Sequence, residues 1–220
     1  MAAFDEMHGY DPAGAEVREL YAQISRWLDD APDGLLDTRR QQAELFFRRV
    51  GITFAVYGEA EASERLIPFD IIPRVLGKSE WAVLERGLKQ RADTLNAFLA
   101  DIYGPRECIR AGVVPADLIY RNSQYRVEMV GKRAPHGVYA HIAGIDLVRV
   151  SEGEFFVLED NVRTPSGVSY MLENREAMMR LFPELFAEHR VAPVESYPAP
   201  SWPACARWRR RGPRATRRSC

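Results

Sequence analysis

The sequence predicts a mixed α+β protein, on the basis of two observations. In the first part of the chain, apolar residues recur every three or four positions, which is the spacing of amphipathic helices with one buried face. From about residue 136 the pattern changes to short runs rich in β-branched and aromatic residues, separated by turn residues. We therefore expect a helical amino-terminal region in residues 1–135, followed by an antiparallel sheet in residues 136–197.

Helices dominate the expected amino-terminal region. The apolar spacing predicts three of them, over residues 15–28, 37–49 and 79–103. In the longest, Ser79 is the expected cap, Gly104 followed by proline ends the helix, and Trp81 begins the stripe of buried residues. The pattern also predicts a strand at residues 52–57 and a short helical piece at residues 115–120.

Strands follow residue 136. The alternation of residues predicts three of them, over residues 138–142, 145–150 and 154–159, and then a helix over residues 170–182. The last two strands are separated by a short polar turn around Glu152-Gly153, which indicates a hairpin. If the hairpin closes there, residues that face each other across it have numbers that add up to 305.

This register gives the hairpin a cluster of oxygen ligands. Asp146 lies opposite Glu159, and Asn161 shares the face of Glu159 because side chains alternate along a strand. Two opposed carboxylates repel each other unless a cation lies between them or one keeps its proton. Two acids and an amide oxygen are suited to Mg²⁺. The sequence therefore predicts a metal site here. The alternative is that these acids are ordinary solvated surface residues. A shift of the strand register by one residue would separate the three side chains.

The segment that follows the last strand supplies three candidate cofactor-binding residues, Arg163, Ser166 and Arg175. The guanidinium fork matches phosphate and carboxylate groups, and a rigid turn offers hydroxyls near the strand end. The alternative for Arg175 is a surface ion pair with Glu173 or Glu176 on the helix.

Charge and hydropathy narrow the class of protein. The formal charge is −1, but seven arginines and no acid lie in the last twenty residues, so residues 1–200 carry −8. An acidic body argues against nonspecific nucleic-acid binding. No apolar stretch approaches the roughly 20 residues that a membrane-spanning helix needs, and the amino terminus lacks the layout of a signal peptide. We expect a cytoplasmic protein with neither membrane nor nucleic-acid partners.

The arginine-rich tail, residues 198–220, differs abruptly from the rest. It has no apolar periodicity, so we expect it to be disordered. One interpretation is a basic segment that binds single-stranded nucleic acid through its arginines and tryptophans. The preferred interpretation is an aberrant end produced by translation of GC-rich DNA in a shifted frame.

Several stretches together resemble a known family. They are ERLIPFDIIPRVL, HIAGIDLVRV, FFVLEDNVRTPSGVSYMLENR and LFPELF. These stretches closely resemble the circularly permuted ATP-grasp proteins of bacteria, which are related to ligases of the glutathionylspermidine synthetase type. The resemblance covers most of residues 1–197 and its motifs are long, which makes it specific.

The resemblance implies a chemistry for the oxygen cluster. In that family the matching Asp, Glu and Asn bind the Mg²⁺ ions that accompany ATP, which implies the same role for Asp146, Glu159 and Asn161. The implied reaction is ATP-dependent joining of a small-molecule or peptide carboxylate to an amine through an acyl phosphate. The family and the strand register thus indicate the same three residues.

The chain also departs from the family pattern. Members are longer, and the lysines and glycine-rich loop that grip ATP come after the metal-binding strand. Here no lysine follows Lys132 and no glycine-rich loop follows Gly167. We therefore expect a truncated ligase that is inactive alone. The alternative is a noncatalytic binding or scaffold remnant that contacts a protein partner through its exposed surface.

Overall fold

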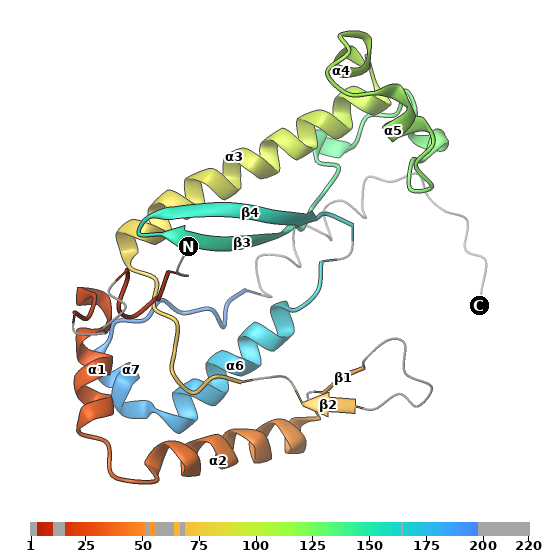
Figure 1. Cartoon of the computed structure of the whole chain (residues 1–220). Coiled ribbons are helices and arrows are strands. Elements are labelled where there is room, and N and C mark those ends of the chain that lie inside the picture. The colour runs from red at the N-terminus through yellow and green to blue at the C-terminus, as the bar shows by residue number, and fades with distance from the viewer. Residues whose placement is uncertain are drawn as a thin grey trace. The chain divides into compact units, whose positions relative to one another are not determined.

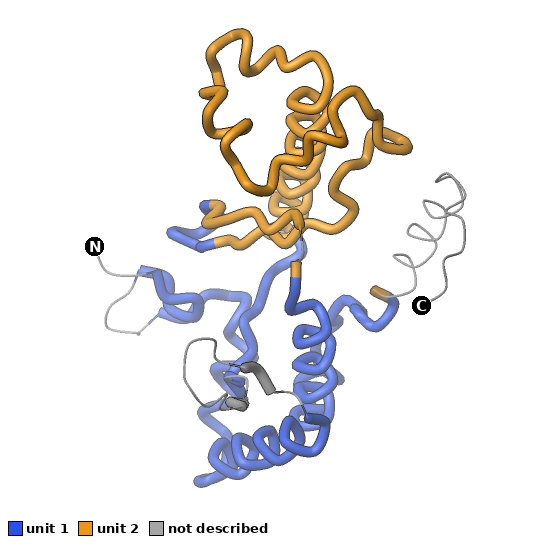
Figure 2. Tube along the Cα trace, turned by 90° about the vertical axis from the view of Figure 1, so that its right-hand side faces the viewer, with its two compact units in different colours: residues 1–78, 148–156, 166–196 blue, residues 79–147, 157–165, 197–220 orange. Residues whose placement is uncertain are grey.

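The computed structural model describes residues 4–10, 16–51, 53–55, 64–66, 69–163 and 165–197 (Figure 1). They form two compact units, each assembled from separate chain segments (Figure 2). Unit 1 comprises Met1–Lys78, Val148–Phe156 and Ser166–Ser196, and unit 2 comprises Ser79–Leu147, Val157–Pro165 and Tyr197–Cys220. The fold class is mixed α+β, as predicted. The expected regions 1–135 and 136–197 stay predictions, and the tail, 198–220, lies outside the described residues.

Helices form the core of unit 1. They are η1 (Glu19–Tyr21), α1 (Ala22–Asp29), α2 (Leu35–Val50), α6 (Val168–Leu181) and α7 (Pro183–Glu188). The predicted helices at 15–28, 37–49 and 170–182 correspond to η1 with α1, to α2 and to α6. Helix α7 was not predicted, although Pro183 at its first position suits a helix start.

Aromatic residues fill the space between these helices. Phe47 of α2 and Phe182 after α6 are fully buried in one apolar cluster with Met178 and Leu181. The rings of Trp27 and Phe182 meet edge to face, with their centres 5.4 Å apart, a favourable geometry for two aromatic rings. Helix α2 ends at Gly51, whose φ of 75° is a left-handed conformation that glycine adopts at little cost.

A small antiparallel ladder accompanies α2. Strands β1 (Thr53–Ala55) and β2 (Glu64–Leu66) pair with Thr53 opposite Leu66. Strand β1 falls within the predicted strand at 52–57, of which residues 52, 56 and 57 lie outside the described residues.

Helix α3 (Lys78–Tyr103) is the longest of the described elements (Figure 1). All of its residues except Lys78 belong to unit 2. It begins one residue before Ser79, so Ser79 is inside the helix, and its prediction as the cap was wrong. Leu84 and Ile102 are buried on one side of the helix, but Trp81 is 51% exposed, which corrects its assignment to the buried stripe. Trp81 sits in the first turn of the helix, where the described part of the chain covers little of its ring.

The segment after α3 contains short helices. They are α4 (Glu107–Arg110), α5 (Ala116–Tyr120), η2 (Val127–Met129) and η3 (Pro135–Gly137), and α5 confirms the helical piece predicted at 115–120. The segment folds onto the end of α3, because the ring of Tyr103 stacks on Tyr125 and Tyr139. The Tyr103 hydroxyl also accepts a hydrogen bond from the backbone N–H of Arg126 at 3.1 Å.

The strand predicted at residues 138–142 was wrong, since this stretch has no strand structure. The side chain of Asn96 in α3 forms hydrogen bonds with the backbone of this stretch instead. The Asn96 carbonyl oxygen accepts the N–H of Tyr139 at 2.7 Å and that of Ala140 at 3.0 Å. A backbone whose N–H groups bond to a helix side chain cannot also use them in a strand ladder.

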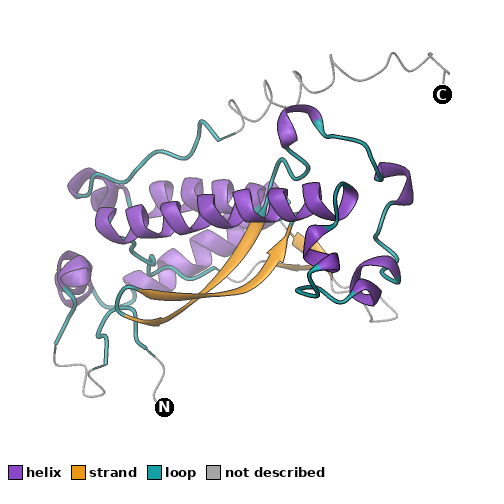
Figure 3. Ribbon diagram, turned by 90° about the horizontal axis from the view of Figure 1, so that it is seen from above, coloured by secondary structure: helices purple, strands orange, loops and turns teal. Residues whose placement is uncertain are grey.

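Strands β3 (Gly144–Ser151) and β4 (Glu154–Asn161) form the hairpin, and Figure 3 shows them as a long twisted pair. They are slightly longer than the predicted strands at 145–150 and 154–159. A two-residue turn, Glu152-Gly153, joins them, so they run antiparallel. At the open end, a Cβ placed on Gly144 would lie 3.7 Å from the Asn161 Cβ. This contact agrees with the predicted register, in which residues 144 and 161 face each other.

Two observations along the hairpin depart from the predicted alternation of faces. The Arg149 guanidinium lies 4.4 Å from the centre of the Phe155 ring, so these two side chains share a face. Between the turn and the open end the alternation of burial breaks, because Leu158 and Glu159 are both exposed. Both observations depart from the strict alternation that a register summing to 305 requires.

Candidate functional site

The three predicted metal ligands lie at the open end of the hairpin. Asp146 belongs to β3, Glu159 and Asn161 belong to β4, and all three are exposed residues of unit 2. At this end Gly144 lies beside Asn161, and the alternation of the strands from this pair puts all three on one face. This arrangement offers two carboxylates and an amide oxygen, a donor set that fits a hard cation such as Mg²⁺.

No cluster of three or more His, Cys, Asp or Glu side chains suited to a metal ion occurs among the described residues. The predicted set does not belong to that category, because its third member is an asparagine. The assignment of Asp146, Glu159 and Asn161 as metal ligands therefore stays a prediction.

Asp160, between two of these residues, points to the opposite face and is held by helix α3. The Nε of Arg91 donates to Asp160 Oδ1 at 2.6 Å, and Nη2 donates to Oδ2 at 2.5 Å. Hydrogen bonding from Arg91 lowers the pKa of the Asp160 carboxyl, and bonding to Asp160 raises the pKa of Arg91. Sequence reasoning missed this pair, because a helix residue and a strand residue 69 positions apart leave no local signal.

At the same end of the hairpin, Gly144 lies very close to Pro165 in the turn that follows β4. A Cβ placed on Gly144 would lie 3.1 Å from the Cβ of Pro165, closer than ordinary contacts allow without a shift. Glycine at position 144 therefore lets the turn that follows β4 fold back over the start of β3. The turn that carries the predicted hydroxyl and guanidinium groups thus begins next to the acidic strand end.

The predicted cofactor-binding residues fall in both units. Arg163 is exposed in unit 2, whereas Ser166 and Arg175 belong to unit 1. The Nη1 of Arg175 donates to the carbonyl oxygen of Ala192 at 2.8 Å, and its guanidinium lies 5.8 Å from the centre of the Phe186 ring. Arg175 therefore fastens the segment after α7 to α6, and a role in cofactor binding stays a prediction for all three residues.

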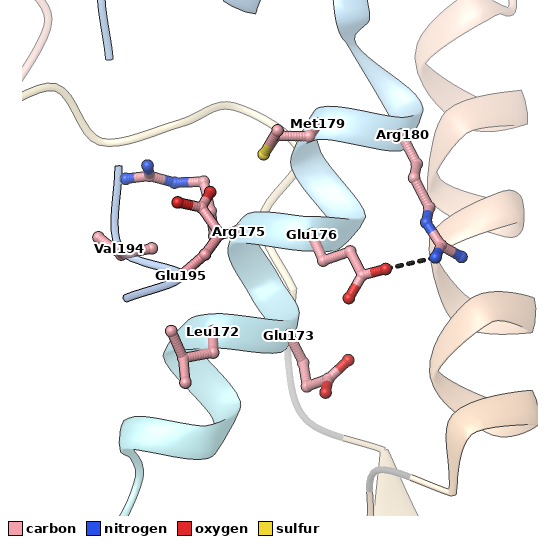
Figure 4. Close-up of a pocket in the computed structure, with 8 residues that line it drawn as sticks. All are labelled: Leu172, Glu173, Arg175, Glu176, Met179, Arg180, Val194 and Glu195. Carbon is pink, nitrogen blue, oxygen red and sulfur yellow. Dashed lines mark hydrogen bonds and ion pairs between the residues drawn. The ribbon is translucent and has the colours of Figure 1, made fainter. Parts of the chain in front are cut away.

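A surface hollow of about 520 Å³ lies beside α6 (Figure 4). Five of its eight lining residues are charged, and the lining consists of Leu172, Glu173, Arg175, Glu176, Met179, Arg180, Val194 and Glu195. Arg180 forms an ion pair with Glu176 in this lining, as the dashed line in Figure 4 shows. The hollow contains one predicted site residue, Arg175, and none of the predicted metal ligands.

Within the described part of the chain, the most buried charged side chain is at the turn end of the hairpin. Arg149 has a side chain that is 1% exposed, and its Nε lies 3.0 Å from Glu6 Oε2. Arg74 bonds to the other oxygen of Glu6 at 2.5 Å, and Arg18 lies 3.7 Å from Oε2. These contacts tie the hairpin turn to the amino-terminal segment within unit 1, so we assign the group a structural role.

Comparison with protein families identifies the class to which this fold and this strand end belong. The family described as a circularly permuted ATPgrasp matches residues 73–206, which include every predicted metal ligand. The chain belongs to the circularly permuted ATP-grasp family, as the resemblance of its motifs indicated.

Its relatives are bacterial proteins. An uncharacterized protein of Synechocystis sp. is 40% identical over 203 residues, which are 88% of this chain and 42% of that protein. An uncharacterized protein of Mycobacterium leprae is 46% identical over 195 residues, which are 89% of this chain and 34% of that protein. A Frankia casuarinae protein with the provisional name glutamate–cysteine ligase 2-2 is 37% identical over 196 residues, covering 87% of this chain and 22% of that protein. The chain thus spans less than half the length of these relatives. In the described residues, no helix is both long and apolar enough to cross a membrane.

Proposed function

We propose that the chain is the metal-binding part of an ATP-dependent carboxylate–amine ligase. The observation that carries the proposal is the placement of Asp146, Glu159 and Asn161 on the exposed face of one hairpin end in a member of the ATP-grasp family. Their oxygens would hold Mg²⁺, which offsets the negative charge that develops on phosphate groups during phosphoryl transfer. The name of the Frankia relative supports the ligase class.

The proposed reaction joins a carboxylate to an amine. A carboxylate oxygen of the first substrate takes the terminal phosphoryl group of ATP, which gives an acyl phosphate and ADP. The amine nitrogen of the second substrate then attacks the carbonyl carbon, and the C–O bond to phosphate breaks to give an amide and inorganic phosphate. In this scheme Arg163, Ser166 and Arg175 are proposed to contact the phosphates of ATP, and both substrates are small molecules or peptides.

We further propose that this chain is inactive by itself and that it acts in the cytoplasm, where ATP is available. Its relatives are more than twice as long. The family resemblance places the lysines that grip ATP after the metal-binding strand, and no lysine follows Lys132 here.

A noncatalytic binding or scaffold role is the second candidate. It is favoured by the exposed apolar side chains of the hairpin, of which Phe156 is 58% exposed and Val148 43% exposed. Apolar groups of this size on a two-stranded ribbon are typical of surfaces that pack against another protein segment.

Phosphate release by a chimaera distinguishes the two candidates. Residues 1–197 would be followed by the remaining part of the Synechocystis relative, and circular dichroism would check that the product folds. The ligase proposal expects ATP-dependent phosphate release that Asp146→Ala abolishes and the control Glu154→Ala preserves. A folded but inactive chimaera would favour the scaffold role.

A further inference from the structure

We propose that Arg91 is a positioning residue, which fixes the face on which β4 presents Glu159 and Asn161 by holding Asp160 between them. This inference rests on the proposed metal-binding function of those two residues. Arg91 would act on metal affinity through the strand, without contacting the metal.

The contact itself has the geometry of a specific anchor. Both nitrogens on one side of the Arg91 guanidinium donate to the two oxygens of Asp160, at 2.6 Å and 2.5 Å. Such paired bonds fix the orientation of both groups as well as their distance. The Asp160 side chain is 17% exposed, whereas its neighbours Glu159 and Asn161 are exposed. The pair therefore marks the side of the strand that faces helix α3.

Because side chains alternate along β4, the contact between Arg91 and Asp160 also determines where the two predicted ligands point. Successive side chains point to opposite faces, so Asp160 facing α3 requires Glu159 and Asn161 to face away from it. A shift of the register by one residue would turn both ligands toward α3 and expose Asp160. One contact thus decides the direction of two predicted metal ligands.

The hairpin needs such an anchor at this place. A two-stranded ribbon specifies its register weakly on its own. The alternation along the hairpin is also irregular between the contact of Arg149 with Phe155 and the contact of Gly144 with Asn161. Asp160 directly follows Leu158 and Glu159, two successive exposed residues, so its attachment to α3 fixes the register where the alternation alone does not.

The experiment measures the binding of Mn²⁺ alone, as a spectroscopic substitute for Mg²⁺, by electron paramagnetic resonance. Arg91→Gln should weaken Mn²⁺ binding by roughly tenfold, the lower end of the effect of groups that orient metal ligands. Arg91→Lys keeps the positive charge but cannot make the paired hydrogen bonds of a guanidinium group. Its affinity for Mn²⁺ should therefore lie between that of Arg91→Gln and that of the wild type. Hydrogen exchange without metal should be faster at residues 159–161 in Arg91→Gln.

Lys89→Gln is the matched control. Lys89 lies on the same helix and pairs with Glu85 at 2.7 Å, at an exposed position of α3. Its loss removes an ion pair from α3 without touching the hairpin, so Mn²⁺ affinity and the exchange at residues 159–161 should not change. A role of Arg91 in stability alone would lower the melting temperature and leave Mn²⁺ affinity as it is.

The possible failures are distinguishable. If the wild type binds Mn²⁺ and Arg91→Gln binds it equally well, the positioning role is overturned while the metal site stands. If the wild type binds no Mn²⁺, the proposed metal site is overturned and the positioning role with it.

Discussion

Asn96 and Ala140 are joined by two hydrogen bonds that use both ends of one side-chain amide. The Asn96 oxygen accepts the Ala140 N–H at 3.0 Å, and its nitrogen donates to the Ala140 carbonyl at 3.4 Å. A single helix residue therefore satisfies the backbone of a stretch that forms no ladder, and it holds the entry to the hairpin against α3.

Replacing Asn96 by alanine should destabilise unit 2. The change leaves part-buried backbone groups of Tyr139 and Ala140 without their partner, which costs about 1–3 kcal/mol of unfolding free energy. Urea unfolding measures the loss. The control is Thr94→Ala, which removes an exposed hydrogen bond within α3 and should cost much less. Equal losses for the two variants would contradict the role of Asn96.

Replacing Arg149 by methionine should destabilise unit 1. The change removes the nearly fully buried partner of Glu6, whose own side chain is 26% exposed. Breaking a buried pair costs about 3–5 kcal/mol when it leaves a charge without a partner, and the exposure of Glu6 and its two remaining arginine contacts reduce this to less than roughly 2 kcal/mol. Thermal and urea unfolding test the value. Arg40→Gln, which removes the exposed pair with Asp37 at 2.7 Å, should cost less than about 1 kcal/mol.

Stability should fall at acid pH partly through Asp101. The thiol and the backbone N–H of Cys108, together with the N–H of Glu107, lower the pKa of Asp101 from its ordinary value of 3.8. A depressed folded-state pKa gives stability that is fully present above the unfolded-state value and is lost as the pH falls through the folded-state value. Melting temperatures between about pH 6 and pH 3 should therefore decline less steeply for Asp101→Asn than for the wild type. A decline as steep in Asp101→Asn as in the wild type would contradict this role of Asp101.

Replacing Glu159 by glutamine should weaken Mn²⁺ binding by at least about tenfold, because it removes a proposed charged ligand. Glu154→Gln is the control on the same strand, since Glu154 lies at the turn and bonds to Ser151 at 3.0 Å. A similar loss in both variants would indicate that the strand attracts cations through its overall charge, with no specific site.

The elements that the sequence predicted well are those whose pattern is local. Helix α3 and strands β3 and β4 follow from the spacing of their apolar residues and from the turn residues that end them. Burial of one face imposes a regular spacing of apolar residues on a helix or a strand, and this spacing can be recognised in the sequence. The family motifs are also local, and they led to the family that the comparisons identify.

The predictions that failed depended on what lies beside an element. Residues 138–142 have the composition of a strand, but Asn96 takes their hydrogen bonds. Trp81 has the helical spacing of a core residue, but no described element covers it enough to bury it. Periodicity shows neither the contact with Asn96, which is more than forty residues away, nor the lack of a covering element over Trp81.

For the candidate site, the sequence by itself determined which oxygen groups stand near the end of the hairpin and to which family they belong. Only the tertiary structure showed that Asp160, in the middle of this group, turns away and binds Arg91. The physical reason is that the backbone of a strand makes its side chains alternate between two faces whatever surrounds it. Which side chains point to which face of the protein depends on contacts with another element, here helix α3.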